Sequence, residues 1–162
     1  MYIHELELPY VTGKKNYPVG DSTVGEGMVA KISPTFPHTS IKISSHIKKL
    51  PSDGGIPSLT EWRWILVMGQ TEGQILLYRE SAGIVIVANT LCTTKHESLL
   101  SVVTHYEEIS GPPKYLTIDW EAAKSAIKRI RDLHPQLLIA GHGGTNARPS
   151  SNGRFRLSNS SF

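Results

Sequence analysis

Two apolar runs separated by a polar turn decide the fold, in the stretch WILVMGQTEGQILLYR at residues 64–79. Short runs of Ile, Leu and Val that glycine bounds are typical of buried strands. We therefore predict strands over residues 62–68 and 74–79. A third such run predicts a strand over residues 83–88, and residues 80–83 form the hairpin turn between the last two strands.

The polar turn at residues 69–74 reads Gly-Gln-Thr-Glu-Gly-Gln. Loops that a rigid scaffold positions often carry binding or catalytic groups. This turn offers two side-chain amides, and it has no strong metal ligand, base or nucleophile. The sequence therefore raises the question of why a turn of this kind carries glutamine instead of a reactive group.

A helix followed by a strand is predicted near the C-terminal end, over residues 119–133 and 136–140. The apolar side chains of the helix recur on one face at spacings of three and four, at Trp120, Ala123, Ile127 and Ile130. Lys124, Lys128 and Arg131 fall on the opposite face. Thr117 or Asp119 can cap the first amides, and Pro135 ends the helix. A helix that leads into a short apolar strand is typical of α/β folds.

Residues 1–40 are rich in glycine and proline and predict mostly irregular structure. Within them we expect a short helix or strand over residues 4–10 that ends at Pro9, and a short helix around residues 27–32. So long a loop is unusual in a compact domain unless it is functional or packs on something else. The β pattern begins with the alternating residues Ile41, Ile43 and Ile47, and a further short helix is expected over residues 99–106.

Length and composition fit one domain, or a fragment of a larger one, with the make-up of a soluble globular protein. The longest apolar run, residues 82–88, is too short to cross a bilayer, and the N-terminus does not have the pattern of a signal peptide. Cys92 is the single cysteine, which favours the cytoplasm. The net charge of +3 is spread without an aromatic-studded basic stripe, so neither nucleic acid nor membrane is an expected partner.

Candidate site residues follow two of the predicted strands. None of the seven histidines is paired with another as His-x-His or His-x-x-x-His, the close spacing that supplies two ligands to many zinc sites. His142 lies between glycines just after the strand over residues 136–140, where α/β proteins often place a site, although a plain turn also fits. Asn89 follows the strand over residues 83–88. It keeps the shape of an aspartate without the charge, and capping of the next segment is the alternative interpretation.

Five segments together resemble the C-terminal part of bacterial metallo-β-lactamase-fold hydrolases, in the glyoxalase-II-like and lactonase-like branch. The segments are HELELPYVTG, TVGEGMVAKISPTFP, WRWILVMGQTEGQILLYR, TTKHESLLSVVTHYEEISGPPKYLTIDWEAAKSAI and LLIAGHG. They occur in order from about residue 2 to residue 144. The resemblance implies an α/β fold, an αββα sandwich with two metal ions, usually zinc, at one edge. Such metals activate a water that attacks an ester, lactone, thioester or amide.

The chain departs from the family pattern at the ligand positions. The family's His-x-His-x-Asp-His motif lies upstream of the HELELPY-like segment, so we expect the N-terminal half of the sandwich to be absent. The family turn Gly-His-Thr-Pro-Gly-His, whose first histidine binds metal, corresponds to residues 69–74, with Gln70 and Gln74 in place of both histidines. The family's bridging aspartate corresponds to Asn89, and the final ligand is retained as His142. Gln70 and Asn89 are therefore degenerate ligand positions that we do not expect to bind metal.

These observations predict three parts of the chain. Residues 1–40 form a loop segment of the same domain, residues 41–144 form the C-terminal half of a metallo-β-lactamase-like domain, and residues 145–162 form a disordered tail.

The predicted function is that of a truncated, degenerate hydrolase relative without catalytic activity, catalytic residues or a bound cofactor. One alternative is a zinc-dependent hydrolase of esters, lactones or thioesters that a partner chain completes. Another is a protein-interaction module, because a half-sandwich exposes an apolar sheet face that self-association or docking on an intact relative would cover.

Overall fold

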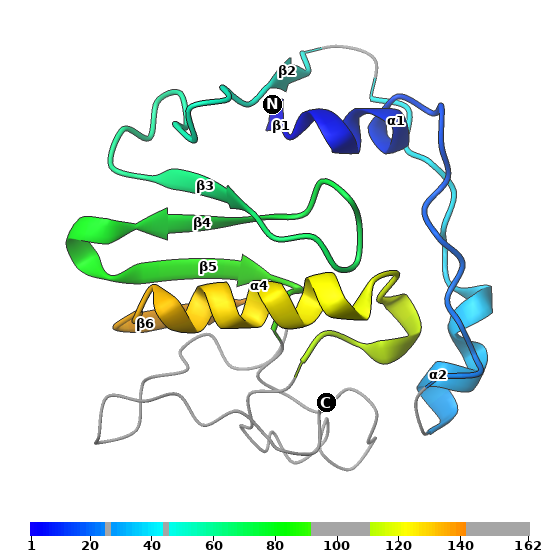
Figure 1. The fold of residues 1–162 in the computed structure, drawn as a ribbon. Coiled ribbons are helices and arrows are strands. Elements are labelled where there is room, and N and C mark those ends of the chain that lie inside the picture. Colours follow the sequence, from blue (N-terminus) through cyan, green and yellow to red (C-terminus); the bar gives the residue numbers. More distant parts are fainter. Residues whose placement is uncertain (25–26, 44–45, 92–110, 142–162) are drawn as a thin grey trace.

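The computed structural model describes residues 1–24, 27–43, 46–91 and 111–141. Its centre is a four-stranded sheet in the order β3-β4-β5-β6 (Figure 1). The strands are β3 (Arg63–Leu66), β4 (Ile75–Arg79), β5 (Ile84–Ala88) and β6 (Leu137–Ala140). β4 runs antiparallel to both β3 and β5, whereas β6 runs parallel to β5. All four strands were predicted from the sequence, and their existence is confirmed.

The hairpin between β4 and β5 is confirmed as well. It consists of a short 3-10 helix, η3 (Glu80–Ala82), and Gly83, whose φ of 60° is left-handed. Glycine adopts this conformation without the steric cost that a side chain brings. The Gly83 carbonyl also accepts the backbone amide of Gln136 at 2.8 Å, which fixes the start of β6 beside the hairpin.

Helix α4 (Trp120–Asp132) precedes β6, as predicted. Of the two candidate caps, Asp119 is the one used: its Oδ1 accepts the amide of Ala122 at 2.9 Å. Another 3-10 helix, η4 (Lys114–Leu116), leads into α4. His134, with a left-handed φ of 46°, and then Pro135 follow its end.

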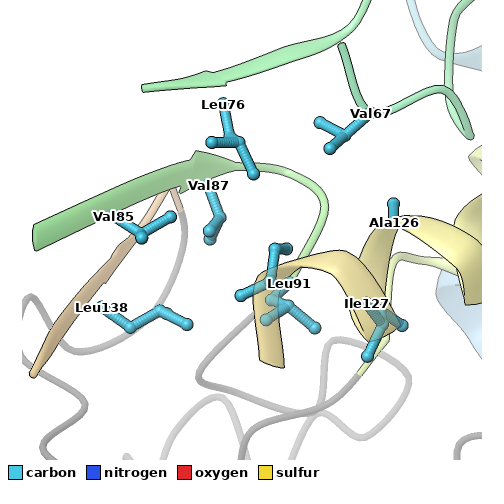
Figure 2. Packing of buried hydrophobic residues seen from close by; sticks show 9 residues of the cluster. Val67, Leu76, Val85, Val87, Leu91, Ala126, Ile127 and Leu138 are labelled. Carbon is cyan, nitrogen blue, oxygen red and sulfur yellow. The ribbon is translucent and has the colours of Figure 1, made fainter. Parts of the chain in front are cut away.

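The core lies between α4 and one face of the sheet (Figure 2). Nine buried residues form it, none more than 5% exposed: Val67, Leu76, Val85, Val87, Leu91, Ala126, Ile127, Ile130 and Leu138. Trp120, expected on the apolar face of the helix, is only half-buried, and Ala126 lies in the core instead. Burial alternates along β5, where Val85 and Val87 are buried and their neighbours are not. The opposite face of the sheet is therefore less covered than the face under α4.

The N-terminal segment begins with β1 (Tyr2–Ile3), which pairs in parallel with β2 (Lys48–Lys49). It continues through η1 (Glu5–Glu7) and α1 (Leu8–Val11). The expectation that an element ends at Pro9 is wrong, because Pro9 lies in the first turn of α1, where the missing amide hydrogen costs nothing.

The short helix expected around residues 27–32 is confirmed as α2 (Met28–Ile32), which η2 (Ser33–Thr35) follows.

The strand expected from the alternation of Ile41, Ile43 and Ile47 does not form as such. Lys42 makes an isolated bridge to Thr12, and regular pairing begins only at β2. Ile41 is 55% exposed, and Ile43 and Ile47 are only half-buried, so the alternation does not place a fully buried face. The helix expected over residues 99–106 and the tail at 145–162 lie outside the described residues. No described helix has the length and apolar character that a membrane crossing requires.

Candidate functional site

The turn at residues 69–74 and the end of β5 meet at a pocket of about 280 Å³. Its lining includes His4, Glu7, Gln70, Gln74 and Asn89. The structure thus brings together Gln70 and Asn89, which the sequence placed after two different strands. His142, the third predicted site residue, lies outside the described residues.

Gly141, the last described residue before His142, reaches the same place. Its amide donates to the Ala88 carbonyl at 2.8 Å. A Cβ at position 141 would lie 3.0 Å from Asn89 Oδ1 and 3.2 Å from the Ala88 carbonyl oxygen. The ends of β5 and β6 therefore meet beside Asn89, which lines the pocket, and the absence of a side chain at Gly141 permits this close approach.

Ala88 has an unusual backbone conformation at the mouth of this site. Its φ is 46°, in the left-handed region, and the pairing of β5 with β6 shifts register between Ile86 and Ala88. This conformation costs a non-glycine residue about 1–2 kcal/mol. A local irregularity of this kind redirects the residue that follows, which here is Asn89 at the pocket.

The inner side of the turn is held by the N-terminal segment. Glu7 Oε1 accepts the Gly73 amide at 3.1 Å and also accepts the Thr71 hydroxyl. On the other side, the Gly69 carbonyl accepts the amides of Ile118 at 2.9 Å and Asp119 at 3.2 Å. The turn is therefore fixed between the N-terminal segment and the start of α4.

Glu72, the only acidic residue of the turn, faces a second set of N-terminal groups. Lys15 Nζ lies 2.6 Å from Glu72 Oε1, and the fully buried Tyr10 donates its hydroxyl to Oε2. The hydrogen bonds from Lys15 and Tyr10 lower the pKa of Glu72 to about 2. Its carboxylate is therefore ionised at neutral pH and already paired, which leaves it poorly suited to act as a base.

Sequence reasoning missed this support of the turn. The bonds from Lys15 and Tyr10 to Glu72 span 57 and 62 residues, and the Glu7 bonds span 64 and 66. Local patterns carry no signal for contacts of this separation. The first quoted segment, HELELPYVTG, contains Glu7 and Tyr10 but ends before Lys15.

Gln74 links the turn to the loop after β5. Its Oε1 accepts a hydrogen bond from the backbone amide of Gln70 at 3.1 Å, and its Nε2 donates to Thr90 Oγ1 at 3.1 Å. In contrast, the structure records no hydrogen bond from the side-chain amides of Gln70 and Asn89 to any described residue. The glutamines of the turn thus differ: the Gln74 side chain bonds through both its oxygen and its nitrogen, whereas the Gln70 side chain makes no hydrogen bond within the described residues.

Comparison with known proteins identifies a relative of this chain. None of the protein-family models matches it. It is 43% identical over 143 residues to the probable metallo-hydrolase YflN of Bacillus subtilis (strain 168), a match that covers 88% of this chain and 54% of that protein. The chain is related to the metallo-hydrolases of the metallo-β-lactamase fold. It spans about half the length of this relative.

One solved metallo-β-lactamase family protein agrees with this chain in fold. The metallo-β-lactamase family protein TTHA1429 from Thermus thermophilus superposes with a TM-score of 0.52 at 15% identity, covering 91% of this chain and 48% of that one. TTHA1623, solved in a di-iron-bound form, gives a TM-score of 0.49 at 17% identity and covers 91% of this chain and 58% of that one. The predicted α/β fold class, as part of a metallo-β-lactamase fold, is confirmed.

The described residues do not fit the two-metal site of the metallo-β-lactamase fold that the resemblance implies. No group of three or more His, Cys, Asp or Glu within residues 1–24, 27–43, 46–91 and 111–141 is placed to hold a metal. Gln70 and Asn89 are neutral amides, poor ligands for zinc beside imidazole, thiolate and carboxylate. The nearby His4 is engaged otherwise: its Nδ1 accepts the Leu6 amide at 3.3 Å, and its ring packs edge-on against Trp64.

Proposed function

We propose that this chain is a degenerate metallo-β-lactamase-fold relative that does not perform metal-dependent hydrolysis. The observation that carries the proposal is the placement of Gln70 and Asn89. Both line one pocket at the strand ends, where the resemblance calls for histidine and aspartate. Replacement of both by amides removes the imidazole and the negative charge that hold metal ions in such sites.

The chemical consequence concerns the nucleophile. Metal ions in such sites lower the pKa of a bound water so that hydroxide is available at neutral pH. Two acidic residues of this region, Glu7 in the pocket lining and Glu72 in the turn, are already engaged. Glu72 is paired with Lys15 and Tyr10, and Glu7 accepts two hydrogen bonds from the turn.

The test is metal content by mass spectrometry after zinc exposure and desalting, together with ester, lactone and thioester hydrolysis assays. We expect near-zero metal per chain and no metal-dependent turnover. The double variant Gln70→His with Asn89→Asp should remain inactive, because the sequence still has no His-x-His-x-Asp-His motif, and His142 with two restored ligands does not make a two-metal site. A double variant with Gln70→Asn and Asn89→Gln, which adds no ligand, is the matched control.

Two results would overturn the proposal. One is stoichiometric zinc in the unmodified chain. The other is metal-dependent hydrolysis by the His/Asp variant that the Asn/Gln control lacks. The first result would favour the alternative that this chain is itself a zinc-dependent hydrolase.

A second candidate function, self-association, is favoured by the face of the sheet opposite α4. We name it the second face, and it consists of Trp64, Leu66, Ile75, Leu77, Ile84, Ile86, Leu137 and Ile139. All eight are half-buried, and the register aligns them in rows such as Trp64–Leu77–Ile86–Ile139. Strands that are apolar on both faces are typical of sheets covered on both sides.

We propose a second copy of this chain as the partner. Arg79, the one charged residue of the four strands on this face, is paired with Glu61 at 2.7 Å. Although the chain carries a net charge of +3, two second faces would therefore meet without like-charge repulsion. Strand spacings give the patch an area of about 300 Å², below the about 800 Å² per partner of a standard interface. The association should therefore be weak and concentration-dependent.

Sedimentation over a range of concentrations tests this proposal. We expect Leu77→Lys to weaken the dimer at least tenfold, because it places a charge in the middle of the second face. Leu59→Lys, at an exposed leucine outside the face, is the matched control and should leave the dimer unchanged. A thermal melt of each variant at low concentration separates dissociation from unfolding.

A chain that stays monomeric throughout, or that responds equally to both substitutions, would contradict self-association. A monomer that co-migrates with purified YflN would instead indicate docking on an intact relative. The cytoplasmic location remains a proposal that rests on the single cysteine, and neither nucleic acid nor membrane is proposed as a partner.

A further inference from the structure

We propose that Gln74 is a polar cross-link that holds the pocket together without a metal ion. This inference rests on the proposed function, since it takes the pocket to be metal-free. The two segments that Gln74 joins, the turn at residues 69–74 and the loop after β5, are the ones that carry Gln70 and Asn89. A metal bound at those two positions would join the same segments.

The backbone of Gln74 is held by a hydrogen bond that does not involve its side chain. Its carbonyl accepts the Val67 amide at 2.8 Å, which extends the pairing of β3 with β4 by one step. The side chain then bonds backward to the Gln70 amide and forward to the Thr90 hydroxyl, each at 3.1 Å. A terminal carboxamide has one acceptor and two donors, so a single group serves both contacts.

We expect loss of this cross-link to lower the stability of the protein, because Thr90 is only 3% exposed. Its own amide donates to the Val87 carbonyl at 3.0 Å, so its backbone stays with the end of β5. A buried hydroxyl that loses its partner is more costly than the bond alone is worth. An apolar residue at position 74 would leave that hydroxyl and the Gln70 amide unpaired together.

The chain offers a close internal control in Gln70. Gln70 is also a glutamine of the same turn, but its side chain makes no hydrogen bond to a described residue, and its backbone amide donates to Oε1 of Gln74. Gln70→Met removes a free amide and leaves the cross-link intact. Gln74→Met removes a bonded amide at nearly constant side-chain volume.

The experiment combines thermal unfolding with hydrogen exchange on the full chain. We expect Gln74→Met to lower the Tm by about 5 °C, whereas Gln70→Met should change it by less than about 1 °C. The amide of Gln70 should exchange at least about tenfold faster in Gln74→Met. With Thr90→Val, which removes the other partner, the Tm losses should be less than additive.

Melting with and without metal separates a failure of the proposed function from a failure of the cross-link. Zinc and a chelator should each leave the Tm of the unmodified chain unchanged. A Tm that rises with zinc would overturn the proposed function, whatever Gln74 does. Equal Tm losses for Gln70→Met and Gln74→Met, unchanged exchange of the Gln70 amide, or additive losses with Thr90→Val would overturn the cross-link alone.

Discussion

Leu76→Ala should lower the free energy of unfolding by about 3 kcal/mol. Leu76 is fully buried in β4 and packs in the core cluster with residues of β5, β6 and α4 (Figure 2). Truncation to alanine removes buried methyl groups and leaves a cavity that the close-packed surroundings fill only in part. Urea unfolding followed by circular dichroism measures the loss as a lower midpoint at an unchanged slope.

The adjacent residue supplies the control for this prediction. Leu77 has the same side chain in the same strand, but it points to the second face and is only half-buried. In dilute solution Leu77→Ala should cost about 1 kcal/mol. If Leu77→Ala were as costly as Leu76→Ala, the second face would be covered as fully as the first, and the surface proposed for self-association would not exist.

Gly73→Ala should destabilise the protein by about 2 kcal/mol and loosen the N-terminal segment from the turn. A Cβ at position 73 would lie 2.7 Å from the backbone nitrogen of Glu7 and 2.6 Å from its Cγ. Because a backbone atom blocks the space, the segment that carries Glu7 must move, and overpacking of this kind costs about 1–3 kcal/mol. Thermal unfolding gives the loss, and faster hydrogen exchange over residues 4–15 locates it.

Gly55→Ala is the matched control for the glycine substitution. The nearest atom to a Cβ there is Oδ1 of Asp53 at 3.0 Å, the end of a side chain in a loop away from the pocket. This variant should lose less stability than Gly73→Ala and leave exchange over residues 4–15 unchanged. An equal loss in both variants, with no change in exchange over residues 4–15, would show that the close approach of Glu7 to the turn is unimportant.

Prediction of the sheet and of α4 succeeded because their signals are local. Each strand is a short apolar run with glycine or polar residues at its ends, and α4 has an apolar face, a capping Asp119 and a following Pro135. The strand prediction failed where the alternating apolar residues are not buried in the fold. The alternation at Ile41 predicted a strand, yet Ile41 is exposed and Lys42 forms an isolated bridge to Thr12.

The candidate site was predicted in part. Gln70 and Asn89 were singled out by their places after apolar runs and by resemblance, and the structure brings both to one pocket. The roles of Glu7, Tyr10 and Lys15 could not be found in the same way, because each acts across about sixty residues of sequence.

The sequence by itself determined which segments form the sheet and helix, and which chemical groups stand at the strand ends, because periodicity, caps and residue types are local properties. Only the tertiary structure decided that the Gln74 side chain bonds to Thr90 while the Gln70 side chain makes no hydrogen bond to a described residue, and that Glu7 of the N-terminal segment holds one side of the turn. The two glutamines have the same side chain, so their difference arises from the partners that the fold places within hydrogen-bond distance.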